Sequence, residues 1–119
     1  MINIFPKNRL FLFWNIGKNV YEKQDCYSNI VEKYSNYYTY LYGNSYLFTR
    51  ENIHLMKKFY LCFPIFYKKM EKITWDQYRL ILSFTDKDER YFYYYLSMLF
   101  ETDYSETEEL IENDYYIRI

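Results

Sequence analysis

Basic side chains that recur at helical spacing are the first candidates for chemistry in this sequence. Four of them fall on one face of a predicted helix: Arg50, His54, Lys57 and Lys58. Guanidinium and ammonium groups arranged in this way bind phosphates or carboxylates. Lys68 and Lys69 follow closely enough to reach adjacent phosphates. The alternative is the solvated side of an amphipathic helix, which is the commoner role for any single residue of this kind.

A second set of candidate contacts is acidic and aromatic and lies nearer the C-terminal end. The range Glu101–Asp114 holds seven acids and no base, so it could dock on a basic partner surface by imitating phosphates. The candidates for partner binding are Tyr93, Tyr94, Glu101, Asp103, Glu109 and Glu112. We expect Tyr93 and Tyr94 to be exposed aromatic contacts. The alternative for the acids is a helix start favoured by the helix dipole, followed by a solvated tail.

Catalytic and metal-binding chemistry is not indicated. His54 is the single histidine and is expected to be a surface residue, while Cys26 and Cys62 match no metal-ligand spacing. Paired carboxylates that hydrolyse a bond need a cleft and a raised pKa, and no segment suggests either. We therefore expect a protein that is not an enzyme, that has no cofactor or metal, and that takes no small-molecule substrate.

The chain has the length of a single domain, and its net charge creates no strong overall electrostatic field. We predict one helical domain over residues 1–119, with residues 1–8 as a loose lead-in. The net charge of −1 excludes a general attraction to nucleic acid or to an anionic membrane. The apolar run Leu10–Trp14 is much shorter than the ~20 residues that cross a bilayer. We therefore expect a cytoplasmic protein with no membrane partner.

The segment from Thr49 to Phe63 carries the basic face and is predicted to be the central helix. Thr49 can cap the first amides, Glu51 suits the positive end of the helix dipole, and Pro64 prevents continuation. The apolar residues recur on another face and are expected to be buried: Ile53, Met56, Phe59, Tyr60 and Phe63. A helix of this kind buries one stripe and offers the other to a partner.

Two helices are predicted before this segment. The first ends near Gln24 and contains Gly17, whose cost of about 1 kcal/mol relative to alanine indicates close packing by another helix. The second is capped by Asp25 or Ser28 and ends in a left-handed cap at Gly43–Asn44. Its inward residues are expected to be Ile30, Tyr34, Tyr37 and Leu41.

Capping signals open three helices in the second half of the chain: Thr74 with Gln77, Asp86 with Glu89, and Ser105 with Glu108. A short basic segment, Tyr67–Lys72, precedes them as one or two turns. Inward residues are expected at Trp75, Tyr78, Ile81, Leu82, Phe92, Tyr95, Leu96, Leu99, Leu110 and Ile111. Tyr37–Tyr42 and Tyr91–Tyr95 have β-prone composition but no alternation. We therefore predict an all-α, compact bundle of five to seven helices with a helix-turn-helix-like core, anchored by Trp14 and Trp75.

Five groups of residues follow one another in a specific order: Phe13–Lys18 with Glu22–Gln24; Phe48–Ile53 with Met56, Phe59, Tyr60 and Pro64; Ile73–Tyr78 with Leu80 and Leu82; Asp86–Phe92; and Leu110–Glu112 with Tyr116, Arg118 and Ile119. Together they resemble the N-terminal domain of YhcG-type proteins, a family in which a PD-(D/E)xK nuclease domain follows. The resemblance covers nearly the whole chain. It implies a helical domain with helix-turn-helix character that contacts nucleic acid or partner proteins.

Two features depart from that family. The sequence ends at Ile119, where the family's nuclease would begin, so we expect no metal-dependent cleavage. Family members often carry consecutive basic residues after the Ser or Thr that opens the central helix. Here Arg50 is followed by Glu51, whose carboxylate would repel a phosphate backbone.

These observations favour a non-enzymatic module that acts through a protein partner, namely a nuclease or defence complex. Its role would be that of a small mobile-element-type inhibitor of a nucleic-acid-processing or defence nuclease complex. The supporting features are the absence of catalytic groups, the 18 tyrosines and the uneven charge. The alternative is a nucleic-acid-binding, helix-turn-helix-like module that uses the basic range Arg50–Lys72 on phosphates, such as the binding half of a split nuclease.

Overall fold

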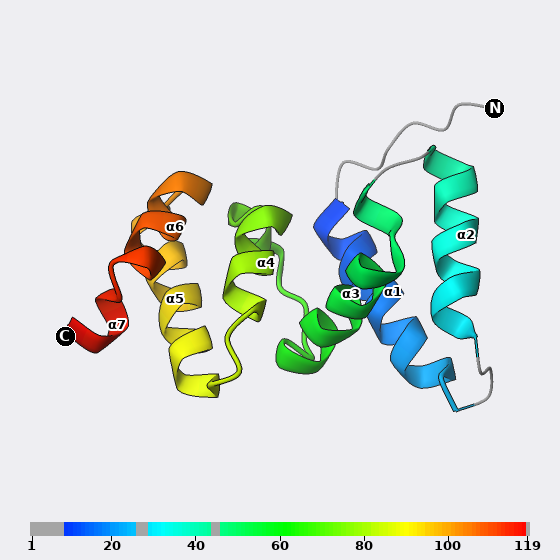
Figure 1. Ribbon diagram of the computed structural model, residues 1–119, viewed down its shortest axis with the longest axis horizontal. Helices are drawn as coiled ribbons and strands as arrows, with labels where there is room; N and C mark the ends of the chain where they lie inside the picture. The colour runs from blue at the N-terminus through cyan, green and yellow to red at the C-terminus, as the bar shows by residue number, and fades with distance from the viewer. Residues whose placement is uncertain (1–8, 26–28, 44–45, 119) are drawn as a thin grey trace. The chain divides into compact units, whose positions relative to one another are not determined.

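The structure, a computed structural model, describes residues 9–25, 29–43 and 46–118, and every regular element within these ranges is helical (Figure 1). The described elements are α1 (Arg9–Lys23), α2 (Ile30–Tyr42), the 3-10 helix η1 (Tyr46–Phe48), α3 (Arg50–Cys62), the 3-10 helix η2 (Lys68–Lys72), α4 (Trp75–Leu82), α5 (Lys87–Phe100), α6 (Tyr104–Glu112) and α7 (Tyr115–Arg118). The predictions of an all-α protein and of five to seven helices are confirmed. The predicted lead-in at residues 1–8 lies outside the described residues.

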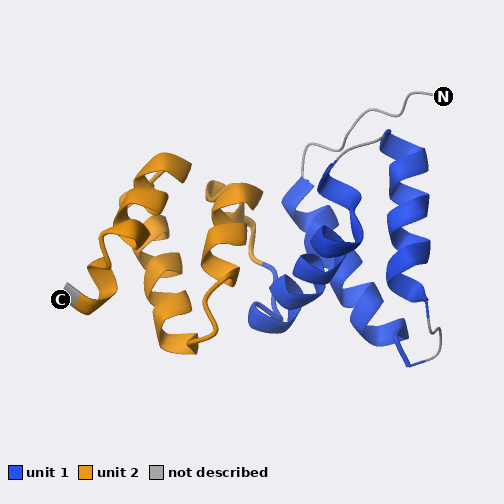
Figure 2. Ribbon diagram, in the orientation of Figure 1, with its two compact units in different colours: residues 1–66 blue, residues 67–119 orange. Residues whose placement is uncertain are grey.

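The chain divides into two compact units, unit 1 (residues 1–66) and unit 2 (residues 67–119) (Figure 2). Unit 1 contains α1, α2, η1 and α3, and unit 2 contains η2 and α4 to α7. Each unit buries aromatic and aliphatic side chains of its own. The single domain over residues 1–119 and its helix-turn-helix-like core stay predictions.

Helix α3 packs against α1, α2 and η1 and is therefore the central helix of unit 1. The Thr49 hydroxyl caps it by accepting a hydrogen bond from the N–H of Asn52 at 3.3 Å. The helix ends at Cys62, shortly before Pro64. Its inner face is fully buried at Ile53, Met56 and Phe59. The predicted central helix, its cap and its buried stripe are confirmed, except that Tyr60 is only half-buried.

Gly17 sets the distance between α1 and α3. A Cβ atom at this position would lie 1.9 Å from the carbonyl oxygen of Met56 and 2.4 Å from its carbonyl carbon. Only a residue without a side chain lets the two helices approach this closely, so the predicted close packing at Gly17 is confirmed. One turn earlier, the indole N–H of the buried Trp14 donates to the carbonyl of Phe63 at 2.7 Å, which ties α1 to the end of α3.

The two ends of α2 differ from their predictions. The N-cap is Asn29, whose side chain makes no capping hydrogen bond, instead of Asp25 or Ser28, of which Ser28 lies outside the described residues. At the other end Gly43 has a φ of 94°, where glycine is favoured, but its ψ of 173° is extended and not left-handed helical. Its N–H donates to the carbonyl of Thr39 at 2.8 Å. Asn44 lies outside the described residues.

The inward face of α2 is set by Phe48 of η1. Tyr38 and Tyr42 stack on this buried ring, with centroid distances of 5.4 and 5.8 Å. Ile30 is buried as predicted, whereas the expectation that Tyr37 faces inward is wrong, because its side chain is exposed. Tyrosines occupy several faces of this helix, so their spacing alone does not select the one that packs.

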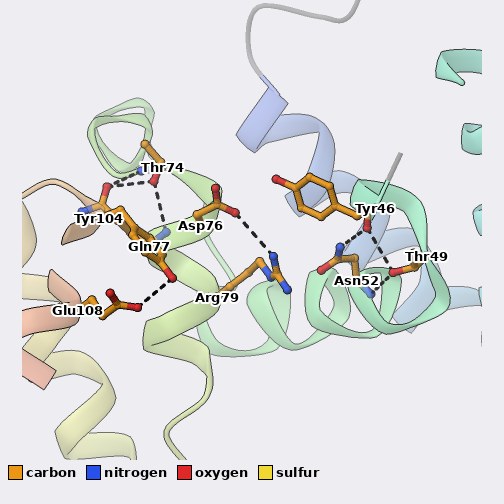
Figure 3. A network of polar contacts seen from close by, with 9 residues as sticks. All are labelled: Tyr46, Thr49, Asn52, Thr74, Asp76, Gln77, Arg79, Tyr104 and Glu108. Carbon is orange, nitrogen blue, oxygen red and sulfur yellow. Dashed lines mark hydrogen bonds and ion pairs between the residues drawn. The ribbon is translucent and has the colours of Figure 1, made fainter. Parts of the chain in front are cut away.

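In unit 2 the side chain of the buried Gln77 caps α4 and also bonds to the start of α6. The Gln77 side-chain oxygen accepts from the N–H of Thr74 at 2.9 Å, and the Thr74 hydroxyl accepts from the N–H of Gln77, which completes the predicted capping box of α4 (Figure 3). The Gln77 side-chain N–H₂ donates to the carbonyl of Thr102 at 2.6 Å and to the Thr107 hydroxyl at 3.1 Å. Gln77 thereby joins the start of α4 to the start of α6.

The hydrophobic part of unit 2 is built around α4. Its buried apolar residues are those that the sequence predicts: Trp75, Tyr78, Ile81 and Leu82. The Tyr78 hydroxyl donates to the carbonyl of Met70 at 2.7 Å, which fixes η2 against α4. The predicted short basic segment is therefore a 3-10 helix with the buried Met70 at its middle.

Helix α5 begins at the predicted cap, because the Asp86 carboxylate accepts from the N–H of Asp88 at 3.1 Å, and not from the predicted partner Glu89. Its inward face, however, differs from the prediction. Tyr93, Tyr94 and Ser97 are buried, while Tyr95 and Leu99, which are predicted to face inward, are exposed. The buried side is fixed by contacts from other elements, namely Tyr78 of α4, Phe84 before the helix and the backbone N–H of Tyr116.

Helix α6 starts earlier than the predicted pair of Ser105 and Glu108. Its capping box is formed by Asp103 and Glu106: the Asp103 carboxylate accepts from the N–H of Glu106 at 2.8 Å, and the Glu106 carboxylate accepts from the N–H of Asp103 at 3.1 Å. This register buries Thr107, which receives the Gln77 bond, and leaves Leu110 and Ile111 half-buried. The polar network of unit 2 therefore decides where α6 begins.

Replacing Gly17 by alanine should lower the free energy of unfolding although alanine is the better helix former. The helix propensity gains about 1 kcal/mol, but the added methyl group forces the backbones of α1 and α3 apart at a cost of up to about 3 kcal/mol, so we expect a net loss of about 1–2 kcal/mol. Urea denaturation followed by circular dichroism measures the change. Asn19→Ala in the same helix is the control and should be neutral or stabilising; equal stability of Gly17→Ala and wild type would contradict the close contact.

Replacing Gln77 by glutamate should destabilise the protein in a pH-dependent way. A carboxylate cannot donate to Thr102 and Thr107, and its burial as an ion costs about 3–5 kcal/mol. Burial raises the pKa of this carboxyl in the folded state, so the loss should be smaller at pH 4 than at pH 7. Thermal melts at both pH values test this. Gln24→Glu, in the half-buried turn after α1, is the matched control and should show little change at either pH.

Candidate interaction surfaces

The four predicted basic residues of α3 lie together on its outer side. Arg50 and His54 are exposed and Lys57 and Lys58 are half-buried, opposite the buried stripe of the same helix. Arg50 is also engaged within the chain, because its guanidinium forms an ion pair with Glu32 of α2 at 3.1 Å. This pair is exposed on both sides, so it contributes little stability, but it reduces the positive charge at the start of the face.

Lys68 and Lys69 belong to η2 in unit 2 and are exposed. The Lys69 ammonium lies 5.6 Å from the ring centroid of Tyr67, a cation–π contact within the same short segment. Their predicted continuity with the basic face of α3, which is in unit 1, stays a prediction.

The predicted acidic contacts of unit 2 have different structural roles. Glu101 follows α5 with a left-handed φ of 51° and lies 3.8 Å from the Lys72 ammonium. Asp103 is occupied in capping α6. Glu109 and Glu112 are exposed on α6. The sequence pattern of an aspartate followed three residues later by a glutamate was the available signal for the role of Asp103.

The predicted exposure of Tyr93 and Tyr94 is wrong. Their side chains are only 2% and 6% exposed, and burial raises the pKa of both phenols. Tyr93 stacks on Phe84 at 5.1 Å between centroids, and its hydroxyl accepts a hydrogen bond from the backbone N–H of Tyr116. These two residues hold α5 against α4 and α7, so they cannot be the first contacts of a partner.

Three other residues of α5 form the exposed apolar surface that sequence reasoning missed. Tyr95, Leu99 and Phe100 are 63%, 76% and 66% exposed, and we refer to them as the α5 surface. Tyr95 and Leu99 are one helical turn apart and share a face. Tyr91 precedes them by one more turn and stacks on Tyr95 at 6.2 Å between centroids. The α5 surface is the strongest candidate for a contact with another molecule.

Helix α7 extends the aromatic character of this region. Phe92 of α5 packs on Tyr115 and Tyr116, with centroid distances of 6.1 and 5.1 Å, and Tyr115 and Ile117 are exposed. No sequence signal distinguished these residues, because α5 is apolar on nearly all sides and α7 is a single turn.

The two units carry opposite charge. Residues 1–66 contain eight lysines and arginines and four acids, a net charge of +4, whereas residues 67–119 contain seven and twelve, a net charge of −5. These values add up to the −1 of the whole chain. The basic face of α3 and the α5 surface therefore lie in units of opposite charge, and they suit different ligands.

The described residues hold no group of three or more histidine, cysteine, aspartate or glutamate side chains that could bind a metal ion. Cys26 lies outside them. None of the helices within the described ranges combines the length and the apolar character that crossing a bilayer requires.

Comparison with known proteins finds one family. The model of the DUF1016 N-terminal domain matches residues 5–118. No curated protein and no solved structure matches the chain significantly. The match spans both units and agrees with the resemblance to the YhcG-type N-terminal domain.

Proposed function

The chain belongs to the DUF1016 N-terminal domain family, and from this premise we propose that it is a non-enzymatic module that acts by binding a protein partner. The α5 surface is the observation that carries the proposal. It places two aromatic side chains and a leucine, each more than half exposed, in the second half of one helix. Exposed aromatic residues that lie together are typical of protein interfaces.

The free energy available from burying these apolar side chains is large enough to support a partner contact. Fully burying one large apolar side chain contributes about 1.5–3 kcal/mol, part of which is lost to the ordering of the two molecules. Tyr95, Leu99 and Phe100 together therefore supply the centre of a binding surface, around which polar contacts determine specificity.

We further propose that the partner belongs to a nucleic-acid-processing or defence nuclease complex, and that the protein inhibits this complex by occupying one of its binding surfaces. The proposal is supported by the family assignment, because the domain resembles one that precedes a nuclease in YhcG-type proteins. Inhibition by occupation needs a binding surface and no catalytic group of its own.

The proposal predicts that the α5 surface is needed to capture such a complex from cells. Leu99→Asp replaces an exposed leucine by a charge, which leaves the fold intact and disrupts an apolar contact. Affinity capture with quantitative mass spectrometry should recover a nuclease or defence component with the wild type and at least tenfold less with Leu99→Asp.

Tyr40→Asp is the matched control for this capture experiment. Tyr40 is 87% exposed on α2 in unit 1, so its replacement should not change the captured proteins. Capture of no nuclease or defence component by the wild type, or equal recovery with Leu99→Asp, would refute the proposed function.

A nucleic-acid-binding module is the second candidate, and the basic face of α3 favours it. Lys57, Lys58 and His54 share one side of a helix whose other side is fully packed, so the helix presents them in a fixed arrangement. Glu51, at the start of the helix, and the ion pair between Arg50 and Glu32 weaken this surface for phosphates.

This candidate predicts salt-sensitive binding of DNA or RNA. The double variant Lys57→Glu/Lys58→Glu should weaken binding at least tenfold and make the salt dependence less steep by one to two ions, because each lost phosphate contact removes about one released counterion. Fluorescence anisotropy with duplex and single-stranded probes between 20 and about 200 mM salt measures both quantities.

Lys87→Glu, at the start of α5 in unit 2, is the control and should have a smaller effect. Lys68→Glu/Lys69→Glu tests whether η2 belongs to the same surface. If the wild type shifts no probe at low salt, the nucleic-acid function is excluded.

A further inference from the structure

The α5 surface is part of a linear apolar stripe. Tyr91, Tyr95 and Leu99 follow at intervals of four residues, so they form one row about 12 Å long on the side of α5 opposite the buried Tyr93 and Ser97. Phe100 is also exposed but lies about 100° around the helix from Leu99, so it flanks the row. A row of this length and direction matches the apolar stripe of another helix lying along it.

Acidic residues stand at both ends of the stripe. Asp88 lies one turn before Tyr91, and Glu101 directly follows Phe100, so the backbones of the two residues are about 20 Å apart along the helix axis. Both residues are exposed. A helix that covers the stripe therefore meets the carboxylate of Asp88 at one end and, at the other, that of Glu101, which lies 3.8 Å from the Lys72 ammonium.

Several carboxylates also act on the aromatic residues near α7. Burial, followed by the carboxylates of Asp86, Asp88 and Glu89, raises the pKa of Tyr116. The Tyr93 phenol shows the same direction, because burial is reinforced by the nearby charges of Glu89 and Asp114. These acids therefore lie close enough to the aromatic region to influence it.

The bases in the same region do not balance these acids. The Arg90 guanidinium donates to the carbonyl of Phe84 at 3.0 Å and lies 5.9 Å from the Tyr91 ring centroid. Lys72 is paired with Glu101. Lys87 at the start of α5 is the further base. The carboxylates of Asp86, Asp88, Glu89 and Asp114 act on the phenols of Tyr116 and Tyr93, and Glu101 lies at the other end of α5, in a unit whose net charge is −5.

We propose that the α5 surface binds a basic amphipathic helix of the partner, with the partner's apolar stripe along Tyr91, Tyr95 and Leu99 and with lysines or arginines toward Asp88 and Glu101. This inference rests on the proposed function and names the chemistry of its partner. Nucleic acids and anionic membranes are repelled by the acids around the stripe.

The chain's own basic helix is a poorer occupant of this surface. The apolar stripe of α3 is buried within unit 1, and Leu61 is the large apolar residue exposed on its outer side. Helix α3 of a second copy can thus supply the positive charge but not the apolar stripe. The partner helix must offer both.

Three synthetic 18-residue helical peptides test the inference. They share one leucine stripe and carry lysine, glutamine or glutamate on their polar face. Fluorescence anisotropy with the full chain should show that the lysine peptide binds at least tenfold more tightly than the glutamine peptide and that the glutamate peptide does not bind. Tyr95→Ser/Leu99→Ser should reduce binding of the lysine peptide at least tenfold, and Tyr40→Ser should not change it. Asp88→Asn/Glu101→Gln should make the lysine and glutamine peptides bind equally, with circular dichroism showing that each variant is folded.

Equal binding of the lysine and glutamine peptides to the wild type, or preference for the glutamate peptide, would overturn the basic-helix inference and leave the captured partner of the proposed function intact. If the Tyr95→Ser/Leu99→Ser variant still binds the lysine peptide as the wild type does, the α5 surface is not the binding site. Sedimentation of the wild type as a dimer that this variant abolishes would identify a second copy as the occupant and also overturn the inference. The proposed function fails on a different result, namely capture from cells that does not depend on Leu99.

Discussion

The contact between Gly17 and the backbone of Met56 is the constraint on which unit 1 depends. Any side chain at this position would collide with a carbonyl group, so the approach of α1 to α3 is possible only for glycine. This approach brings Trp14 within hydrogen-bonding distance of the Phe63 carbonyl. It also buries one side of α3 in the core, so the basic side chains of that helix lie on its solvent-facing side. The basic face is therefore a result of packing and not an independent feature.

In unit 2 the corresponding role belongs to a polar group. Gln77 is almost completely buried, and all of its hydrogen-bonding groups are used, by Thr74 at the start of α4 and by Thr102 and Thr107 at the start of α6. A satisfied buried network of this kind specifies one arrangement, because any other would leave polar atoms without partners. Helix α5 lies in contact with α4, α6 and α7, and its orientation follows from them.

The surfaces that result have distinct characters. Unit 1 is positively charged and presents bases on α3, while unit 2 is negatively charged and presents an apolar stripe on α5 between acids. Clustered exposed aromatic residues are typical of protein interfaces, and this is the physical basis of the binding function that we propose. In that proposal, the charge around each surface selects the class of partner.

The sequence alone determined the features that depend on local chemistry. Thr49, Thr74 and Asp86 cap helices as their types and positions predict, and Gly17 marked the close approach of two helices. It did not determine which sides of the tyrosine-rich helices are buried: Tyr37, predicted inside, is exposed, and Tyr93 and Tyr94, predicted outside, are buried. A helix that is apolar on nearly every side satisfies the helical period in several orientations, so periodicity cannot choose among them. Tertiary contacts made that choice, through Phe48 for α2 and through Tyr78, Phe84 and α7 for α5, and so placed the exposed stripe at Tyr95 and Leu99.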